Sequence, residues 1–344
     1  MSNAELIKSR NSLNTIRLLA ALQVMLGHMA AFLAMPSWLE PVRHILSYFP
    51  GVPLFFTLSG YLIWNSIETS GSYRQYLGKR FLRIYPELWA SVILEIGSIL
   101  CLYWGSVSLP ELAAFTFGQA TVFQFWKPYS LTGFGCGTPN GALWTIPVLV
   151  VFYVVVWWVH RLLHQKGLVR WLAGFLLCAA VSLLVSRSEA FLPEILYKLL
   201  RYSVIPHFWL FYVGMFAAEY VQYLLENLKK YWFFCLLAVF LLHKLNFDME
   251  LGYYPLLESV LLFFGWLGFA YRLPGLNIRK DISYGLYISH MIVVNILLEL
   301  FGSQKLWLIP AAVGISVVIA WVSTTCIGKY TRKLKARFCQ PKIS

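Results

Sequence analysis

Charged side chains are scarce in this sequence. Asp, Glu, Lys and Arg make up 12% of its 344 residues, whereas hydrophobic residues make up 59%. A soluble domain usually carries about twice that charged fraction. The mean hydropathy of +0.65 points the same way. The composition therefore excludes an ordinary soluble domain and predicts an integral membrane protein.

Paired cysteines are also absent. The six cysteines show none of the spacings of a disulfide framework or a cysteine-based zinc site. We therefore expect no disulfide framework and no metal site. Cys136 falls in a loop that we expect to face outward, and no partner for it is evident, so it is predicted to be a free thiol.

Long apolar stretches, by contrast, are abundant. The first is too long for a signal peptide and lacks a small-residue cleavage site, so we expect no cleavable leader. About ten stretches can cross a hydrocarbon core of roughly 30 Å. They lie at about 14–34, 50–67, 86–106, 143–163, 168–187, 203–224, 231–247, 254–272, 282–301 and 306–327, and the seventh is marginal in length. We predict an all-α integral membrane protein whose single transmembrane domain covers residues 1–344.

The net charge of +13 is unevenly distributed along the chain. With ten spans, most Lys and Arg residues fall on the side that carries both termini, which the positive-inside rule places in the cytoplasm. The basic tail at about 329–344 is expected to touch anionic lipid. We expect no nucleic-acid partner, because no soluble basic domain is present to bind one.

Two ionisable residues share one face of the first predicted helix. Arg17 and His28 are eleven residues apart, which brings them within about 20° of one direction and roughly 16 Å apart along the axis. Ionisable residues are costly in a bilayer and usually face protein or an aqueous cavity. His28 is a candidate general base, or else a structural histidine bonded to a neighbouring helix. For Arg17, snorkelling to the headgroups is an equally good explanation.

A pair of arginines lies in the inward stretch 72–85, which reads as an amphipathic interfacial helix. Arg80 and Arg83 are three residues apart and would be neighbours on that helix. Two adjacent guanidinium groups suit a phosphate or pyrophosphate. Binding of lipid headgroups is the alternative interpretation of this pair.

Two further polar features lie within predicted spans. Glu95 lies near the midplane of the third span. It is either a candidate partner of His28 or Arg17, or a protonated carboxyl that is hydrogen-bonded. His290 shares a helical stripe with Ser283 and Tyr287. A polar stripe in lipid must face protein, so this stripe predicts either interhelical packing or part of a site.

The longest segment between spans, about 107–142, is expected to face outward. Glycine, proline and asparagine cluster in it just before the fourth span. A long loop inside a compact protein is often functional, and a simple glycine-rich connector is the alternative.

Several strings in order resemble the acyltransferase family 3 membrane proteins, bacterial enzymes that O-acylate envelope and secreted glycans. The resemblance extends over nearly the whole chain. Each string is weak alone, and the ordered set is specific. The strings are the first span from Arg17 to His28, VPLFFTLSGYLIW (52–64), KRFLRIYPELW (79–89), NGALWTIPVLVVFY (140–153) and DISYGLYISH (281–290).

This resemblance implies an acyl-CoA-dependent O-acyltransferase of the bacterial inner membrane. It implies transfer of an acyl group, usually acetyl, from cytoplasmic acyl-CoA to a sugar hydroxyl, with acyl-CoA as substrate and no permanently bound cofactor. The implied catalytic residues are His28 and Arg17, to which we add Glu95; Arg80 and Arg83, with the adjacent Lys79, are the implied acyl-CoA site. The candidate substrate-binding groups and oxyanion donors are Trp144, Asn140, Tyr284, His290 and Ser59.

Two positions depart from many sugar-modifying relatives, which carry glutamate where this chain has Leu149 and Gly328. The identity of the acceptor and the partner that orients the base are therefore left open. The sequence does not indicate the oligomeric state. A transporter or flippase of a lipid-linked glycan is the main alternative from another class, although no internal repeat of the transporter type is evident. A non-catalytic protein with the same fold is a third.

Overall fold

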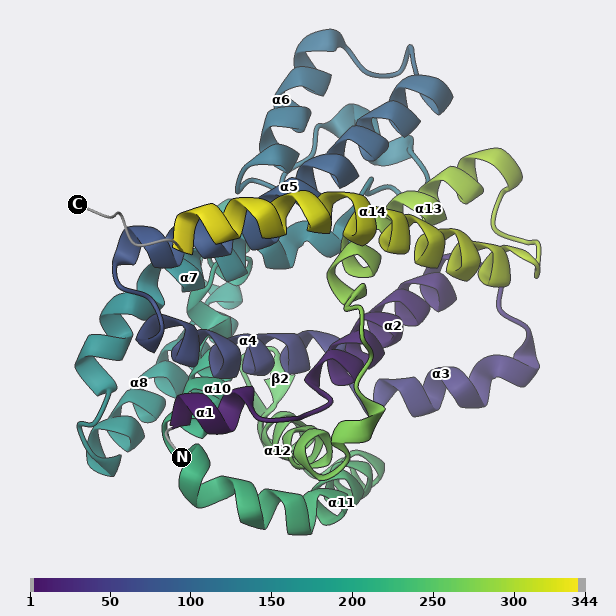
Figure 1. Cartoon of the computed structure of the whole chain (residues 1–344). Helices are drawn as coiled ribbons and strands as arrows, with labels where there is room; N and C mark the ends of the chain where they lie inside the picture. Colours follow the sequence, from purple (N-terminus) through teal and green to yellow (C-terminus); the bar gives the residue numbers. More distant parts are fainter. Residues whose placement is uncertain (1–2, 340–344) are drawn as a thin grey trace. The chain divides into compact units, whose positions relative to one another are not determined.

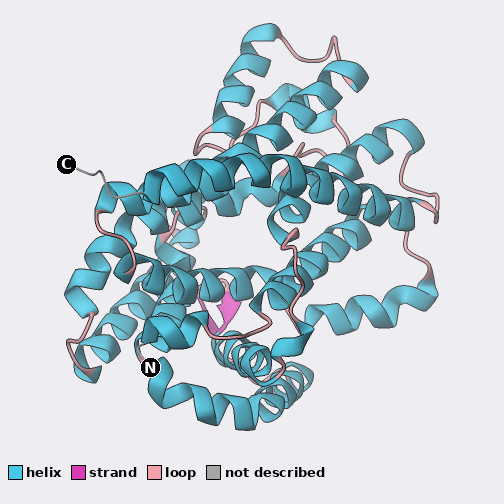
Figure 2. Ribbon diagram, in the orientation of Figure 1, coloured by secondary structure: helices cyan, strands magenta, loops and turns pink. Residues whose placement is uncertain are grey.

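A computed structural model of the protein describes residues 3–339. Its regular structure is almost entirely helical (Figures 1 and 2), and the described strands form one short antiparallel hairpin of β1 (Glu250–Leu251) and β2 (Tyr254–Pro255). The predicted all-α class is confirmed. Of the basic tail at 329–344, the last five residues lie outside the described part of the chain.

The chain divides into two compact units. The first comprises residues 1–20, 48–76 and 148–279, and the second comprises residues 21–47, 77–147 and 280–344. Three long helices contribute residues to both units: α2 (Leu13–Phe32), α5 (Tyr73–Leu102) and α7 (Thr145–Leu163).

The first unit is built around two closely packed helix pairs, α4 with α10 and α11 with α12. Glycines allow the first pair to approach, because a Cβ on Gly60 would collide with the main chain of Phe211, and one on Gly214 would collide with that of Thr57. The helices of this unit are α1 (Asn3–Lys8), α4 (Gly51–Glu68), α8 (Leu168–Arg187), α9 (Glu194–Arg201), α10 (Phe208–Glu219), α11 (Val221–Leu245) and α12 (Leu256–Arg272), with short 3₁₀ turns η4 (Ser188–Ala190), η5 (Ile205–His207) and η6 (Pro274–Leu276).

A bulky side chain at Gly60 is expected to separate α4 from α10. Gly60→Leu should lower the stability of the folded protein by about 3 kcal/mol, because the new side chain meets main-chain atoms that cannot move aside. Thermal unfolding in detergent, followed by tryptophan fluorescence, measures the loss. Gly314→Ala is the matched control, since nothing lies within 4 Å of the Cβ it adds. An equal midpoint for both variants would contradict the prediction.

The second unit is organised around α13, which is buried along most of its length and packs against α14. Gly285 lies against the main chain of Ala320 in this contact. The helices and 3₁₀ turns of this unit are η1 (Ser37–Leu39), α3 (Glu40–Ser47), α6 (Leu109–Ala120), η2 (Tyr129–Gly133), η3 (Gly141–Trp144), α13 (Ser283–Phe301) and α14 (Leu308–Cys339).

The segment at 107–142 is a folded element of this unit and more than a connector. Ser108 and Glu111 form a reciprocal capping box at the start of α6. Residues of α5, α6 and the η2 region also share an apolar cluster. The buried members of that cluster are Ile99, Leu112, Phe115, Leu131 and Phe134.

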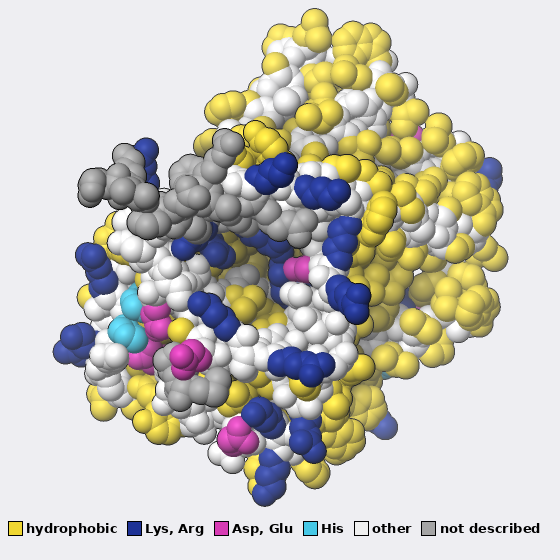
Figure 3. Space-filling view, viewed as in Figure 1, with side chains coloured by type: hydrophobic (Ala, Val, Ile, Leu, Met, Phe, Trp, Pro, Cys, Tyr) yellow, Lys and Arg dark blue, Asp and Glu magenta, His cyan; other side chains and the backbone are white. Residues whose placement is uncertain are grey.

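The surface is suited to lipid. Within the described residues, seven helical segments are long and apolar enough to span a membrane. Large apolar side chains such as Ile93 and Val169 are exposed, and hydrophobic groups cover wide areas of the surface in Figure 3. Wide exposed apolar areas mark contact with a membrane or a partner. The protein is therefore a multi-pass membrane protein.

The three remaining predicted spans correspond to α10, α11 and α12, which do not meet the length or hydropathy of the other seven. The count of ten spans thus remains a prediction. The stretch predicted at 203–224 is divided, because α10 ends at Glu219 and α11 begins at Val221. The expected interfacial helix 72–85 is also not separate. It continues through Pro86 as part of α5, a helix of 30 residues.

Candidate functional site

Two histidines from opposite ends of the chain meet in the second unit. Nδ1 of His28, on α2, lies 2.8 Å from Nε2 of His290, on α13. Their rings are nearly parallel, with centroids 5.1 Å apart and an interplanar angle of 14°. His290 is fully buried, while His28 is partly exposed. Both lie within candidate membrane spans.

The hydrogen bonds assign the proton positions of this pair. Nδ1 of His290 lies 3.1 Å from the carbonyl oxygen of Leu286, which can only accept, so this nitrogen carries a hydrogen. In neutral His290, Nε2 is then an acceptor, and Nδ1 of His28 must donate to it. This leaves the Nε2 lone pair of His28 unused by the partner. The arrangement is that of a general base oriented by a second group.

The other two members of the predicted polar stripe differ in their partners. The hydroxyl of Tyr287 lies 2.9 Å from the hydroxyl of Thr145 and donates to the carbonyl of Ala142 at 3.1 Å, so it joins α13 to the start of α7 and to η3. The Ser283 hydroxyl donates to Asp281, two residues before it, at the start of the same helix. The stripe therefore combines packing against other elements at Tyr287, a local hydrogen bond at Ser283 and the histidine pair at His290.

Asn140, just before η3, is fixed beside the histidine-bearing part of α13. Its Nδ2 donates to the carbonyl of Ile288 at 2.8 Å, and the Ser91 hydroxyl donates to the same carbonyl at 2.8 Å. The Oδ1 atom of Asn140 is buried and has no hydrogen-bond partner in the part of the chain that the structure describes. That oxygen is an acceptor open to a hydroxyl ligand. Trp144 ends η3 and is partly buried.

The glycine-rich end of the 107–142 segment is hydrogen-bonded to the C-terminal half of α13. Gly135 N donates to Glu299 at 2.6 Å and Cys136 N donates to Asn295 at 2.8 Å. The Asn295 amide in turn donates to the carbonyls of Thr138 and Pro139. Gly135 has a positive φ of 55°, and a Cβ there would collide with Asn295. The loop is therefore a fixed wall beside α13.

Cys136 in this wall is a free thiol, as the sequence predicted. Burial raises the pKa of its thiol. A thiol with a raised pKa is a poor nucleophile near neutrality, so Cys136 is not a candidate catalytic group.

The arginine pair lies on α5, near the start of α13. Nη2 of Arg83 lies 3.1 Å from Asp281, and its guanidinium is 5.9 Å from the ring centroid of Tyr284. The Tyr284 hydroxyl donates to the carbonyl of Ile84 at 3.0 Å. Asp281 also accepts a hydrogen bond from Ser283 N, the first residue of α13, so it holds the start of that helix and binds Arg83 as well.

The remaining candidates are placed as follows. Glu95 is fully buried on α5, and neither carboxyl oxygen has a hydrogen-bond partner among the described residues, so the structure pairs His28 with His290 rather than with Glu95. Lys79 and Arg80 are partly buried on α5 beside Arg83. Arg17 belongs to the first unit, on the same continuous helix α2 as His28. Ser59 also lies in the first unit, on α4.

Sequence reasoning missed two groups of polar residues. Asn295 and Glu299, which hold the wall, are single polar residues in an apolar span, and no spacing rule singles them out. His160 and His164 meet Glu68 in the first unit. The four-residue spacing of these histidines at the end of the fourth predicted span is a signal that could have found them.

Fold and site together define a multi-pass helical membrane protein with a hydrogen-bonded histidine pair, of which His290 is buried and His28 is partly exposed, and with an arginine pair near the start of α13. The comparison with known families is specific: an acyltransferase domain model matches residues 10–326. The chain belongs to acyltransferase family 3, as the ordered strings of the sequence indicated. The family supports acyl transfer and favours an acyltransferase over the transporter or flippase alternative.

Curated relatives agree with this class. The chain is 29% identical over 376 residues to nodulation protein 10 of Rhizobium leguminosarum bv. viciae, an alignment that covers 100% of this chain and 99% of that protein. It is 28% identical over 184 residues to an O-acetyl transferase of Shigella phage Sf6, which covers 52% of this chain and 54% of that protein. No solved structure gives a significant match.

Proposed function

We propose that the protein transfers an acyl group, in the first instance acetyl, from acyl-CoA to a hydroxyl of an envelope or exported glycan, with His28 as general base. The observation that carries this proposal is the hydrogen bond from His28 to His290, which leaves one lone pair of a partly exposed imidazole available for a substrate. The O-acetyl transferase among the relatives supports acetyl as the group transferred.

The reaction balances without an external oxidant or reductant. Nε2 of His28 takes the proton of the acceptor hydroxyl as its oxygen attacks the thioester carbonyl. The new C–O bond forms, the C–S bond breaks, and the leaving thiolate of CoA receives the proton from His28. The products are the O-acyl glycan and free CoA. His290 holds the base in orientation throughout, as the third member of a catalytic triad does.

The donor is proposed to bind at Arg80 and Arg83, with Lys79 beside them. Guanidinium groups suit the phosphates of CoA. Tyr284, which contacts Arg83, precedes His290 by six residues on α13, a rise of about 9 Å. The phosphates would therefore lie near the start of α13 and the thioester one to two turns further along it, beside His28.

The acceptor is proposed to bind against the wall formed by the 107–142 segment. The unpartnered Oδ1 of Asn140 is suited to accept a hydrogen bond from a sugar hydroxyl. Trp144 at the end of η3 supplies an aromatic surface of the kind that packs against a sugar ring. Glu95 and Arg17 are kept as further catalytic candidates, and the tyrosine at 284 is a positioning residue because its hydroxyl is already bonded to Ile84.

We infer an inner-membrane location with both termini in the cytoplasm. The excess of Lys and Arg in the segments on the side of the termini supports this orientation. It brings the arginine pair to the compartment that holds acyl-CoA, and the 107–142 segment to the opposite side, where an exported glycan is met.

Deleting the gene tests the function as a whole. Mass spectrometry of the surface and exported glycans is expected to show the loss of one acyl substituent, which returns when the wild-type chain is supplied. A deletion strain whose glycans all keep their acylation would contradict the proposal. Release of CoA from acetyl-CoA by the purified protein separates an enzyme from a transporter, which releases none.

The arginine pair provides a separate prediction for the donor. Replacing Arg80 and Arg83 by Gln should raise the KM for acyl-CoA at least about tenfold and the KM for the acceptor far less, because two phosphate contacts are lost. Steady-state kinetics with each substrate varied in turn measures both constants.

The matched control for this variant is Asp281→Asn. It keeps an oxygen to cap α13 but removes the charge that pairs with Arg83. If the arginine serves only that ion pair, Asp281→Asn will reproduce the kinetic defect. Equal effects of the double variant on both KM values would point to a folding or lipid-binding role.

A further inference from the structure

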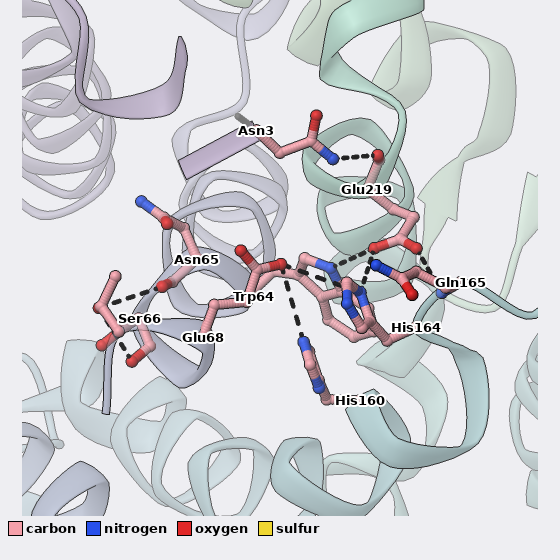
Figure 4. A network of polar contacts seen from close by, with 10 residues as sticks. Asn3, Trp64, Asn65, Ser66, Glu68, His160, His164, Gln165 and Glu219 are labelled. Atoms are coloured by element: carbon pink, nitrogen blue, oxygen red, sulfur yellow. Dashed lines mark hydrogen bonds and ion pairs between the residues drawn. The ribbon is translucent and has the colours of Figure 1, made fainter. Parts of the chain in front are cut away.

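Two histidines and a glutamate of the first unit converge (Figure 4). His160 lies in the last turn of α7, and His164 follows one turn later, where its N–H still bonds to the carbonyl of His160. Glu68 is the last residue of α4. One potential ligand atom from each of the three residues lies within 4.8 Å of the others.

The distances suit a shared ion better than direct hydrogen bonds. Oε1 of Glu68 is 3.9 Å from Nε2 of His160 and 3.9 Å from Nδ1 of His164, too far for a hydrogen bond to either. Around a tetrahedral zinc ion with bonds of 2.0–2.1 Å, ligand atoms are about 3.3 Å apart. The two distances from Glu68 would each have to shorten by about 0.6 Å to reach that spacing, a shift within the reach of side-chain rotation.

A second carboxylate completes the donor set. Oε2 of Glu219, the last residue of α10, lies 2.9 Å from Nδ1 of His164. The Glu219 carboxylate also accepts hydrogen bonds from the indole of Trp64 at 2.8 Å and from Gln165 N at 2.7 Å. Metal-binding carboxylates are commonly fixed by such outer hydrogen bonds, so Glu219 is held in place before an ion arrives.

One ligand atom has no other partner. Nε2 of His160 is buried and makes no hydrogen bond within the described chain. The ring itself is held between Trp64, with centroids 4.4 Å apart, and His164, with centroids 4.6 Å apart. A buried polar atom without a partner costs free energy, and an ion at this position would satisfy it.

Another histidine of the same unit shows what a simple pair looks like. Nδ1 of His243 lies 3.0 Å from Glu258, within hydrogen-bond distance. Within the described residues, only the trio of Glu68, His160 and His164 brings together three potential metal ligands. The wider spacing of Glu68 from both imidazoles separates this contact from an ordinary histidine–carboxylate pair, whereas His164 and Glu219, 2.9 Å apart, form a hydrogen bond that an ion at His164 would replace.

We propose that His160, His164, Glu68 and Glu219 bind a divalent transition-metal ion, with zinc as the expected species. Two imidazoles and two carboxylates form a donor set suited to such ions. The ion would join the ends of α4, α7 and α10. The sequence analysis considered cysteine spacing and predicted no metal site, so this proposal departs from that expectation.

Metal binding by the full-length protein tests the proposal. The protein is purified in detergent without a histidine tag, stripped with a chelator and titrated with Zn²⁺. We expect one equivalent to bind and the thermal midpoint to rise. His160→Ala and Glu68→Gln should each weaken the affinity at least about 100-fold, because each removes one ligand. His243→Ala is the matched control and should bind as the wild type does.

Cobalt gives a readout that does not depend on the variants being folded. Co²⁺ bound to the wild type should show the visible absorption bands of a tetrahedral site, and Zn²⁺ should displace it. The proposal is overturned if the wild type takes up neither ion. It is equally overturned if His160→Ala and Glu68→Gln retain wild-type affinity. Glycan acylation is measured separately, so a failure here leaves the acyltransferase proposal untouched.

Discussion

Replacing His28 with alanine is expected to lower kcat for acyl transfer at least about 1000-fold, within the range that a general base contributes. The acceptor hydroxyl is a poor nucleophile until its proton is taken, and the unused lone pair of His28 is the group proposed to take it. CoA release by the purified protein measures the rate. Mass spectrometry of glycans from a deletion strain that carries the variant measures the same loss in the cell.

The control must separate lost chemistry from lost structure. His243→Ala also removes a histidine that is bonded to a neighbouring side chain, and it lies in the first unit. We expect it to retain acyl transfer. His28→Ala should match the wild type in membrane insertion and thermal midpoint. Substantial activity in His28→Ala would show that another group takes the proton.

Sequence reasoning could identify His28 because its signal is local and energetic. An imidazole within an apolar segment long enough to span a membrane has to be explained, since burial of ionisable groups in lipid is costly. The polar stripe on α13 was visible for the same reason, through its helical spacing. The energetic cost of placing ionisable groups in lipid and the helical spacing of polar residues thus predicted which residues face protein.

The pairing of those residues could not be predicted in this way. His28 and His290 are separated by 262 positions, and no local rule connects them. Glu95 was an equally reasonable partner on the grounds of depth alone. The structure instead leaves its carboxyl without a hydrogen bond among the described residues. Contacts between distant helices depend on packing, which a single sequence does not specify.

Helix boundaries were predicted least well, for reasons that are also physical. The third span was predicted to begin at about residue 86, yet α5 runs through Pro86 and joins the expected interfacial helix to that span. At Glu219 the apolar run of 203–224 is interrupted by a side chain that binds Trp64 and His164. A hydropathy profile registers neither effect.

The histidine pair supplies a candidate for the orienting partner that the sequence left open. The resemblance implies glutamates in many sugar-modifying relatives where this chain has Leu149 and Gly328, and a carboxylate is the usual group that orients a catalytic histidine. In the proposed mechanism the imidazole of His290 takes that role. Its own proton is fixed by the Leu286 carbonyl, so it can accept the hydrogen bond of His28 as a carboxylate would.

Replacing His290 with phenylalanine is therefore expected to lower kcat by at least about 10- to 100-fold, the loss seen when an outer group that orients a metal-bound imidazole is removed. Phenylalanine keeps a planar ring in the buried position but cannot accept the hydrogen bond of His28. The base then loses its fixed tautomer and orientation. The KM for acyl-CoA should change little, because His290 is a positioning residue and not part of the proposed donor site.

His290→Gln is the conservative variant that tests the same bond. Its amide oxygen can accept a hydrogen bond from Nδ1 of His28, so it should recover part of the kcat lost in His290→Phe. A purely structural role predicts the opposite order, because phenylalanine fills the buried space without an unsatisfied polar group, whereas glutamine adds one. Comparing kcat, KM and thermal midpoint for the two variants thus separates orientation of the base from packing of α13.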